Sequence, residues 1–210
     1  MSQEIKGSPM YIQSLAHLRS LYAAPHERSV KKELAQLDAH CARFVAQSPL
    51  VVVASSSPDG AMDASPRGGA PGFVKVLDAG TLLIADSPGN NRLDTLENIV
   101  QNGQVGLLFL VPGVDETLRV NGRAALTTDE ATLAFCADAK RVPKLVIRVS
   151  VEAAYLHCAK ALMRSNLWDA TRHIQRAALP SMGEMLKDQI GGDIPAETQV
   201  QMLVRYAVDL

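Results

Sequence analysis

A series of short apolar segments between residues 49 and 126 constrains the fold of this chain more than any other feature. The segments are rich in Val, Leu and Ile, and clusters of Gly, Pro, Asp or Asn separate them. Such runs, bounded by turn residues, are typical of strands in an antiparallel sheet. In chain order they read PLVVVASSS, AMDASPRG, GFVKVLD, TLLIADS, QVGLLFLVP and ETLRVNGRAAL. We therefore predict one antiparallel sheet, a meander that closes into a small barrel.

Turn signals locate two hairpins in the predicted sheet. Asp59-Gly60 and the stretch from Asp78 to Gly80 favour tight turns, so 50–66 and 73–86 are predicted hairpins. A helix is expected over 128–139, with Thr128 as its cap. The segment KLVIRVSVEAAYLHCAK then returns to strand periodicity.

Helical segments are predicted on both sides of the sheet. Residues 10–47 are expected to form helix in two pieces, because Pro25 disfavours helix at the residue before it. Apolar residues of the second piece recur at spacings of three or four, which places them on one face that would pack on the sheet. They are Leu34, Leu37, Cys41, Phe44 and Val45. The tail, 180–210, is also expected to be helical.

Length and composition favour a single domain. With 210 residues and 47% hydrophobic content, the chain can bury one sizeable core or at most two small ones. We therefore predict one mainly β domain over 1–210, with helical extensions at both ends.

The charge pattern argues against several classes of partner. Lys and Arg number 21 and Asp and Glu 22, for a formal net charge of -1, so the chain lacks the broad cationic field that duplex nucleic acid or an anionic membrane attracts. No segment is apolar enough to span a membrane, and the N-terminus lacks a signal core, so a cytoplasmic location is expected. The three cysteines and five histidines show no metal-ligand spacing, so no metal site and reduced thiols are expected.

The stretch DSPGNNRLDTLENI, residues 86–99, runs from an apolar segment into a predicted helix. Asn91 is placed to cap this helix, Arg92 to begin it, and Asp94 to complete a variant of the capping box. The first turn of a helix carries unpaired N–H groups and a partial positive charge, to which Arg92 adds a full one. This junction is suited to a phosphate group. The alternative is a well-capped helix whose arginine is simply solvated.

A second polar stretch, DASPRGG, lies on a predicted strand. Strand alternation puts Asp63, Ser65 and Arg67 on one face, so a hydroxyl and a guanidinium point the same way. Gly68, Gly69 and Gly72 then leave the adjoining backbone without side chains, which permits close approach of a flat or phosphorylated ligand. Those glycines are also compatible with a simple bend at a barrel corner.

Catalytic motifs are missing from the sequence. It has no GxSxG elbow, and neither a GxGxxG fingerprint nor a P-loop follows any predicted strand. Anion-holding features without a catalytic constellation suit an organic cofactor that carries its own reactivity.

Several strings in the chain resemble a known family. They are SPRGG, PGFVKVLD, TLLIADSPGNNRLDTLENI, GLLFLVPG, DETLRVNGRA and YLHCAKALMRSNLW, and together they cover roughly residues 50–170. In these strings the chain is similar to flavin-binding split-barrel proteins related to pyridoxamine 5'-phosphate oxidase. The resemblance implies a six-stranded antiparallel split β-barrel with flanking helices. It also implies a homodimer with FMN bound at the subunit interface.

The resemblance also assigns site residues position by position. The family's flavin-lining strand matches Ser65, Pro66 and Arg67, with Lys75 further along. The strand end beside the isoalloxazine ring matches Ile84, Ala85 and Asp86. The basic pair that holds the phosphate matches Asn91 and Arg92, with Asn91 in place of the first basic residue. Thr117 stands where a residue from the other subunit reaches the flavin.

Trp168 is the only tryptophan and follows directly on the late strand, so we expect it near the flavin; a plain packing role is the alternative. The implied function is that of an FMN-dependent oxidoreductase acting on an unidentified small substrate, with no catalytic residue assigned. The chain does not end in the arginine- and histidine-containing tail of the oxidases proper, so the resemblance does not extend to vitamin B6 phosphates. A flavin carrier or sensor, or a relative that binds a deazaflavin or haem, remains an alternative.

Overall fold

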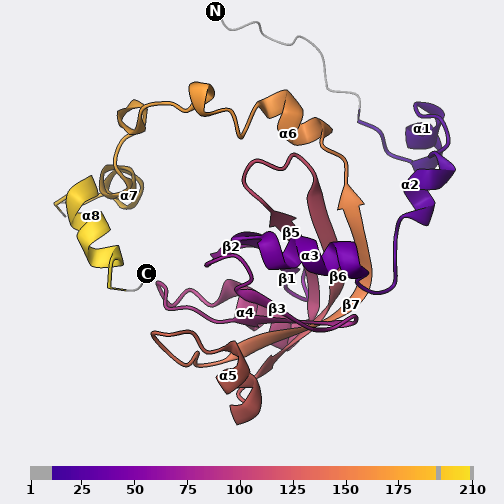
Figure 1. Ribbon diagram of the computed structural model, residues 1–210. Coiled ribbons are helices and arrows are strands. Elements are labelled where there is room, and N and C mark those ends of the chain that lie inside the picture. Colours follow the sequence, from indigo (N-terminus) through magenta and orange to yellow (C-terminus); the bar gives the residue numbers. More distant parts are fainter. Residues whose placement is uncertain (1–10, 193–194, 209–210) are drawn as a thin grey trace, which may run out of the picture. The chain divides into compact units, whose positions relative to one another are not determined.

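The computed structural model describes residues 11–192 and 195–208 (Figure 1). By its contacts the chain divides into two compact units, residues 1–33 and 34–210. The described part of the first unit holds two short helices, α1 (Leu15–Ser20) and α2 (Glu27–Lys31). Residue 10, where the N-terminal helix was expected to begin, lies outside the described residues, as do 193–194 and 209–210 of the expected helical tail.

The second unit is built on one antiparallel sheet in the order β2-β1-β5-β6-β7-β4-β3. Its strands are β1 (Leu50–Ser56), β2 (Met62–Gly68), β3 (Val74–Asp78), β4 (Thr81–Ala85), β5 (Gln104–Leu110), β6 (Thr117–Thr127) and β7 (Val146–His157). The antiparallel, mainly β fold is confirmed, with seven strands in the described residues where the resemblance implies six. Both predicted hairpins are present, as β1–β2 and β3–β4.

The strand order is not the predicted meander. β1 pairs with both β2 and β5, and β7 pairs with both β6 and β4. The two hairpins therefore attach to opposite sides of the β5-β6-β7 centre, because each adds through its own inner strand. Within the described sheet, β2 and β3 form the two edges and are not paired, although a loop over 69–73 joins them. The sheet is thus left open between these strands, as in a split barrel.

The core lies on the concave side of the sheet, beneath two helices. Alternate residues of the central strands are fully buried, among them Val51, Val53 and Phe109. Helix α3 (Ala39–Gln47) contributes Cys41 and Val45 to this core. The second piece of the predicted N-terminal helix is wrong in its extent, since Leu34 lies ahead of α3 and forms an isolated bridge with Ala154.

Helix α4 (Asp94–Gln101) covers the same side of the sheet over β1 and β2. Its Asn98 side chain donates from Nδ2 to the Ser55 hydroxyl oxygen across 3.0 Å, which ties the helix to β1. Helix α5 (Glu130–Cys136) lies near β4 and β7 and begins after Asp129. Thr128 is therefore not its cap, because the Asp129 carboxylate accepts the Thr132 N–H instead.

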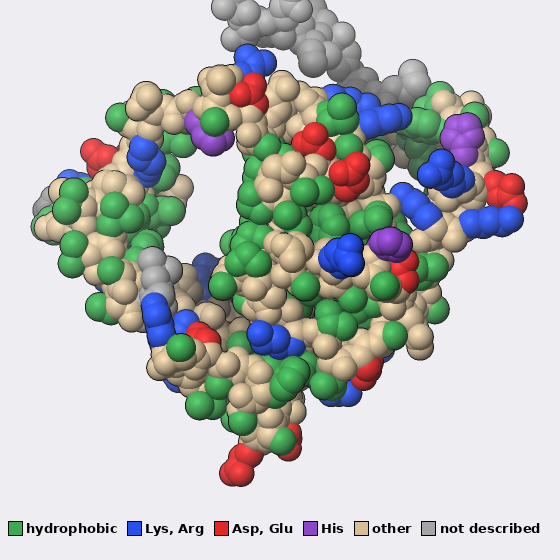
Figure 2. Space-filling model, viewed as in Figure 1, with side chains coloured by type: hydrophobic (Ala, Val, Ile, Leu, Met, Phe, Trp, Pro, Cys, Tyr) green, Lys and Arg blue, Asp and Glu red, His purple; other side chains and the backbone are tan. Residues whose placement is uncertain are grey.

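Helical structure follows β7 in the C-terminal region. After α6 (Lys160–Ser165) and two short 3-10 turns come α7 (Met182–Ile190) and α8 (Gln199–Tyr206), both in the region predicted to be helical. Apolar side chains are exposed on both last helices, as Figure 2 shows by their green colour; Ile190 and Val200 are each 71% exposed. None of the described helices has the length and apolar character needed to cross a membrane.

Candidate functional site

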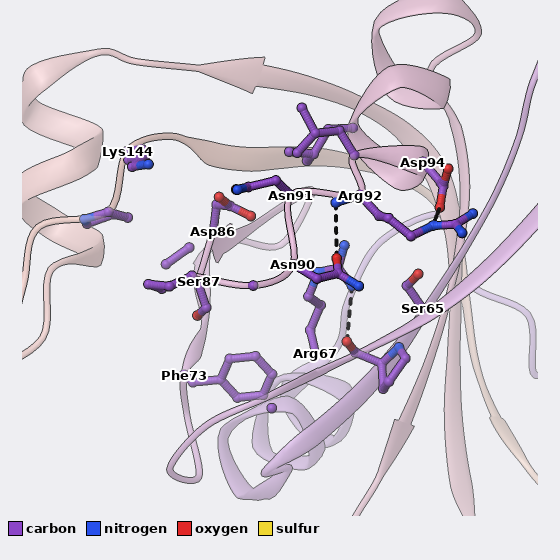
Figure 3. Close-up of a pocket in the computed structure, with 18 of the residues that line it drawn as sticks. Ser65, Arg67, Phe73, Asp86, Ser87, Asn90, Asn91, Arg92, Asp94 and Lys144 are labelled. Carbon is purple, nitrogen blue, oxygen red and sulfur yellow. Dashed lines mark hydrogen bonds and ion pairs between the residues drawn. The ribbon is translucent and has the colours of Figure 1, made fainter. Parts of the chain in front are cut away.

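An open cavity of about 570 Å³ lies where β2, β4, the loop before α4 and the loop before β7 come together (Figure 3). It is lined by Ser65, Pro66, Arg67, Gly68, Phe73, Ala85, Asp86, Ser87, Pro88, Gly89, Asn90, Asn91, Arg92, Leu93, Asp94, Leu96, Arg141, Val142, Pro143 and Lys144. Residues from the C-terminal part of the edge strand β2 thus line the same cavity as a residue of β4, which is distant from β2 in the sheet order.

Strand β2 presents a polar face toward the cavity side of the sheet. As predicted, Asp63, Ser65 and Arg67 share one face, and all three are half-buried, while the residues between them are exposed. The Arg67 guanidinium donates to the Pro66 carbonyl at 3.0 Å and to the Thr95 hydroxyl oxygen at 3.2 Å. The second bond fixes the guanidinium between β2 and α4.

The turn before α4 differs from the prediction. Asn91 adopts a left-handed φ of 60°, which is unlike the extended conformation of an N-cap, and α4 begins at Asp94 instead of Arg92. The Asn90 side chain closes the turn, because its Oδ1 accepts the Arg92 N–H at 3.0 Å. The predicted capping role of Asn91 and the capping-box variant are therefore wrong.

The first turn of α4 opens on the cavity. Leu93 stands at the N-cap position, and its side chain makes no capping hydrogen bond. Leu93, Asp94 and Leu96 all line the cavity, so the positive end of the helix dipole lies at its wall. Arg92 extends toward Asp94 and pairs with it across 3.0 Å, in a direction away from Asp86 (Figure 3).

Asp86 is the half-buried acid of the site. Burial raises the pKa of its carboxyl above the ordinary value, and the positive charges of Arg67, Lys144 and Arg141, in that order, oppose the rise. Two of these cations come from the loop before β7. That loop is held at the cavity because Ala85 at the end of β4 pairs with Val146 at the start of β7.

Seven of the eleven residues assigned from the sequence line this cavity. They are Ser65, Pro66, Arg67, Ala85, Asp86, Asn91 and Arg92. The other four lie elsewhere. Ile84 is fully buried in the core, and the Lys75 ammonium donates to the Gly72 carbonyl at 3.0 Å. Thr117 is buried at the start of β6, and the half-buried Trp168 donates from its indole nitrogen to the Val114 carbonyl at 2.9 Å.

The loop before β7 was not predicted to belong to the site. Arg141 and Lys144 add two cations to the site, and the buried Pro143 adds apolar surface. The basic cluster AKRVPK was a sequence signal for these cations. Its location at the cavity depends on the β4–β7 pairing, which the predicted meander did not contain. Phe73 and Leu96, from the 69–73 loop and α4, were also missed.

The lining combines cationic and apolar surface. Four basic side chains, those of Arg67, Arg92, Arg141 and Lys144, stand against the carboxylates of Asp86 and Asp94. Phe73, Leu96, Val142 and Pro143 supply apolar contacts. The volume falls within the usual range for small-molecule sites, roughly 300 to 1,000 Å³. The arrangement suits an anionic ligand with a flat apolar part.

Comparisons with known proteins point to one family. Residues 37–158, which are 122 of the 210 residues, match the family model described as pyridoxamine 5'-phosphate oxidase. No curated protein matches the chain.

Solved structures from several bacteria match part of the chain. HupZ of Group A Streptococcus is 19% identical, with a TM-score of 0.47, over 57% of this chain and 93% of its own. An FMN-binding protein of Syntrophomonas wolfei is 12% identical, with a TM-score of 0.45, over 56% and 84%. A Clostridium acetobutylicum protein related to general stress protein 26, of the pyridoxinephosphate oxidase family, is 12% identical, with a TM-score of 0.43, over 55% and 83%.

Proposed function

The chain belongs to the pyridoxamine 5'-phosphate oxidase family, and on this premise we propose that it is a flavoprotein that binds FMN in the cavity and acts as an oxidoreductase. The observation that carries the proposal is the convergence of Arg67, Arg92 and the uncapped first turn of α4 on one cavity with an apolar wall. Cations and free N–H groups of this kind bind phosphate.

The residues present fit FMN in both of its parts. A phosphate at the first turn of α4 would meet two arginines, and each charge-assisted bond contributes about 1.5–3 kcal/mol. A flat ring system fits against the apolar side chains of Phe73 and Val142. Ser65, Pro66, Ala85 and Asn91 line the same cavity and would contact the cofactor as its remaining neighbours.

Bound FMN supplies the redox chemistry, accepting electrons from a reductant and passing them to an acceptor. The protein groups would hold and polarise it. Asp86 would face it with a carboxyl whose pKa is raised by burial. Lys75 and Ile84 would act from behind the cavity wall, since Lys75 donates to the Gly72 carbonyl and Ile84 is fully buried in the main core.

We further propose a homodimer with the cofactor at the subunit interface. The convex face of β2, β1 and β5 is apolar and only half-buried at Val52 and Leu108, which lie side by side. Pro66 lies opposite Val52 on β2, so this apolar face runs up to the cavity. A second copy would cover it. Thr117 and Trp168 would then approach the cofactor of the partner subunit.

The direct test is the spectrum of the purified protein, followed by titration of the apoprotein with FMN and with riboflavin. FMN should bind, and riboflavin, which lacks the phosphate, should bind at least about tenfold more weakly, as expected for the loss of one charge-assisted contact. Bleaching by a reduced nicotinamide without oxygen would indicate an enzyme rather than a carrier. Failure of the apoprotein to bind FMN, or preference for a deazaflavin or haem, would overturn the assignment.

A further inference from the structure

We propose that Asp63 and Thr95 are positioning residues, which hold the Arg67 guanidinium at the cavity and so set the preference for a phosphorylated ligand. Neither residue lines the cavity. The inference rests on the proposed function, because it assigns the support of the arginine that would bind the FMN phosphate.

Three side chains form a directed chain of hydrogen bonds. Arg67 donates from Nη2 to the Thr95 hydroxyl oxygen across 3.2 Å, and the Thr95 hydroxyl donates to Oδ2 of Asp63. Thr95 is 2% exposed, and Asp63 is half-buried, so water competes little for the inner bond. These hydrogen bonds join the edge strand β2 to the first turn of α4, the two elements that form one wall of the cavity.

The direction of these bonds follows from proton counting. A hydroxyl carries one hydrogen, and Thr95 gives it to the Asp63 carboxylate, which can only accept. The hydroxyl oxygen is thereby left as an acceptor for Arg67, and the direction of the Arg67–Thr95 bond cannot reverse. The other Asp63 oxygen accepts from the Ser65 hydroxyl at 2.9 Å, so the carboxylate is fixed on both sides.

A carboxylate beside an anion site weakens anion binding by repulsion, so its presence there calls for a compensating role. Asp63 contributes to raising the pKa of Arg92, after the larger effect of Asp94, so its charge is felt at the second cation of the site. Asp63 is linked to Arg67 only indirectly, by way of the Thr95 hydroxyl. The guanidinium can therefore make further bonds from its remaining N–H groups. Ordering the guanidinium before the ligand arrives lowers the entropy cost of binding.

The test compares two substitutions at one position in the full-length protein. Thr95→Val keeps the shape of the side chain and removes the oxygen, whereas Thr95→Ser keeps the oxygen and removes a buried methyl. The dissociation constants for FMN and riboflavin are measured for both variants, the wild type and Arg67→Ala, with the thermal midpoint of each apoprotein.

The expected result is that Thr95→Val binds FMN about tenfold more weakly, with riboflavin affinity unchanged. Thr95→Ser should bind FMN like the wild type, even though its lost methyl lowers the thermal midpoint. A purely structural role for Thr95 would move both ligands together. Unchanged riboflavin binding also establishes that the Thr95→Val cavity is folded.

The outcomes separate the inference from the function on which it rests. If Arg67→Ala weakens FMN binding but Thr95→Val does not, or if Thr95→Ser is weakened as much as Thr95→Val, the positioning role is wrong and FMN binding stands. If the wild type binds no FMN, or if Arg67→Ala binds it unchanged, the assigned phosphate site itself is wrong.

Discussion

The backbone N–H of Asp86 donates to the carbonyl oxygen of Leu145 across 3.0 Å, extending the β4–β7 pairing by one bond beyond the strand ends. The bond holds the carboxylate at the end of β4 beside the basic loop that precedes β7. The acid and two of the cations that face it, Arg141 and Lys144, therefore come together through sheet register alone.

We predict that Asp86→Asn stabilises the apoprotein at pH 7. Burial raises the folded-state pKa of Asp86 above its unfolded value, so ionisation of this group costs stability as the pH rises above the ordinary pKa, and the cost is complete above the raised pKa. Below the ordinary pKa both states are protonated and the cost vanishes. The thermal midpoint of Asp86→Asn should thus exceed that of the wild type at pH 7, with a difference that shrinks toward about pH 4. A difference that grows with acidity would contradict this.

Removal of the Arg67 side chain should weaken FMN binding about ten- to hundredfold, because one or two charge-assisted bonds to the phosphate are lost. Riboflavin affinity should change little. Titration by flavin fluorescence measures both. Arg148→Ala is the matched control, since Arg148 is exposed on β7 and does not line the cavity; equal losses in the two variants would point to a general charge effect.

Arg92 should also contribute, but against competition from Asp94. The ion pair between them is exposed at Arg92, so its own strength is modest. Arg92→Ala should weaken FMN binding, whereas Asp94→Asn should strengthen it by about two- to fivefold, because a carboxylate that competes with the phosphate is removed. Calorimetric titration at low salt checks both. Weaker binding by Asp94→Asn would mean that the stabilisation of α4 by its first-turn carboxylate matters more to binding than the release of Arg92 from the ion pair.

Light scattering should give a mass of twice 22.5 kDa for the wild type. Val52→Asp, on the convex apolar face, should shift it toward the monomer, since burying an unpaired carboxylate in an interface is costly. Val100→Asp is the control, because Val100 is 74% exposed on α4. A wild type at 22.5 kDa would refute the dimer.

Trp168 provides an intrinsic probe of the interface. It is the only tryptophan in the chain and does not line the cavity of its own protomer. If the partner's cofactor lies beside it, FMN added to apoprotein should quench its fluorescence, and Val52→Asp should abolish the quenching together with the dimer. Unchanged fluorescence on saturation with FMN would assign Trp168 a packing role.

Local patterns sufficed for the strands and hairpins. Period-two alternation placed Asp63, Ser65 and Arg67 on one face of β2, and the Asp-Gly turn signal located the first hairpin correctly. These features depend on neighbouring residues, which the sequence displays directly.

Features that depend on distant pairing were not predicted. The contributions of Arg141 and Lys144 require β7 to pair with β4, and nothing within either segment specifies its partner. The start of α4 was missed for a local reason. Asn90 and Asn91 both suit caps and turns, and the structure uses Asn90 to close the turn and Asn91 for the left-handed residue.

The place of β2 at an edge of the sheet has a consequence for solubility. An unpaired edge offers its N–H and carbonyl groups to any extended chain and so invites aggregation. Here Pro66 has no N–H to offer, and the charges of Asp63 and Arg67 point inward from the same strand. The residues that would serve the ligand also deter edge-to-edge association. Substitutions that make this strand more regular and apolar would therefore favour fibres before they abolished the fold.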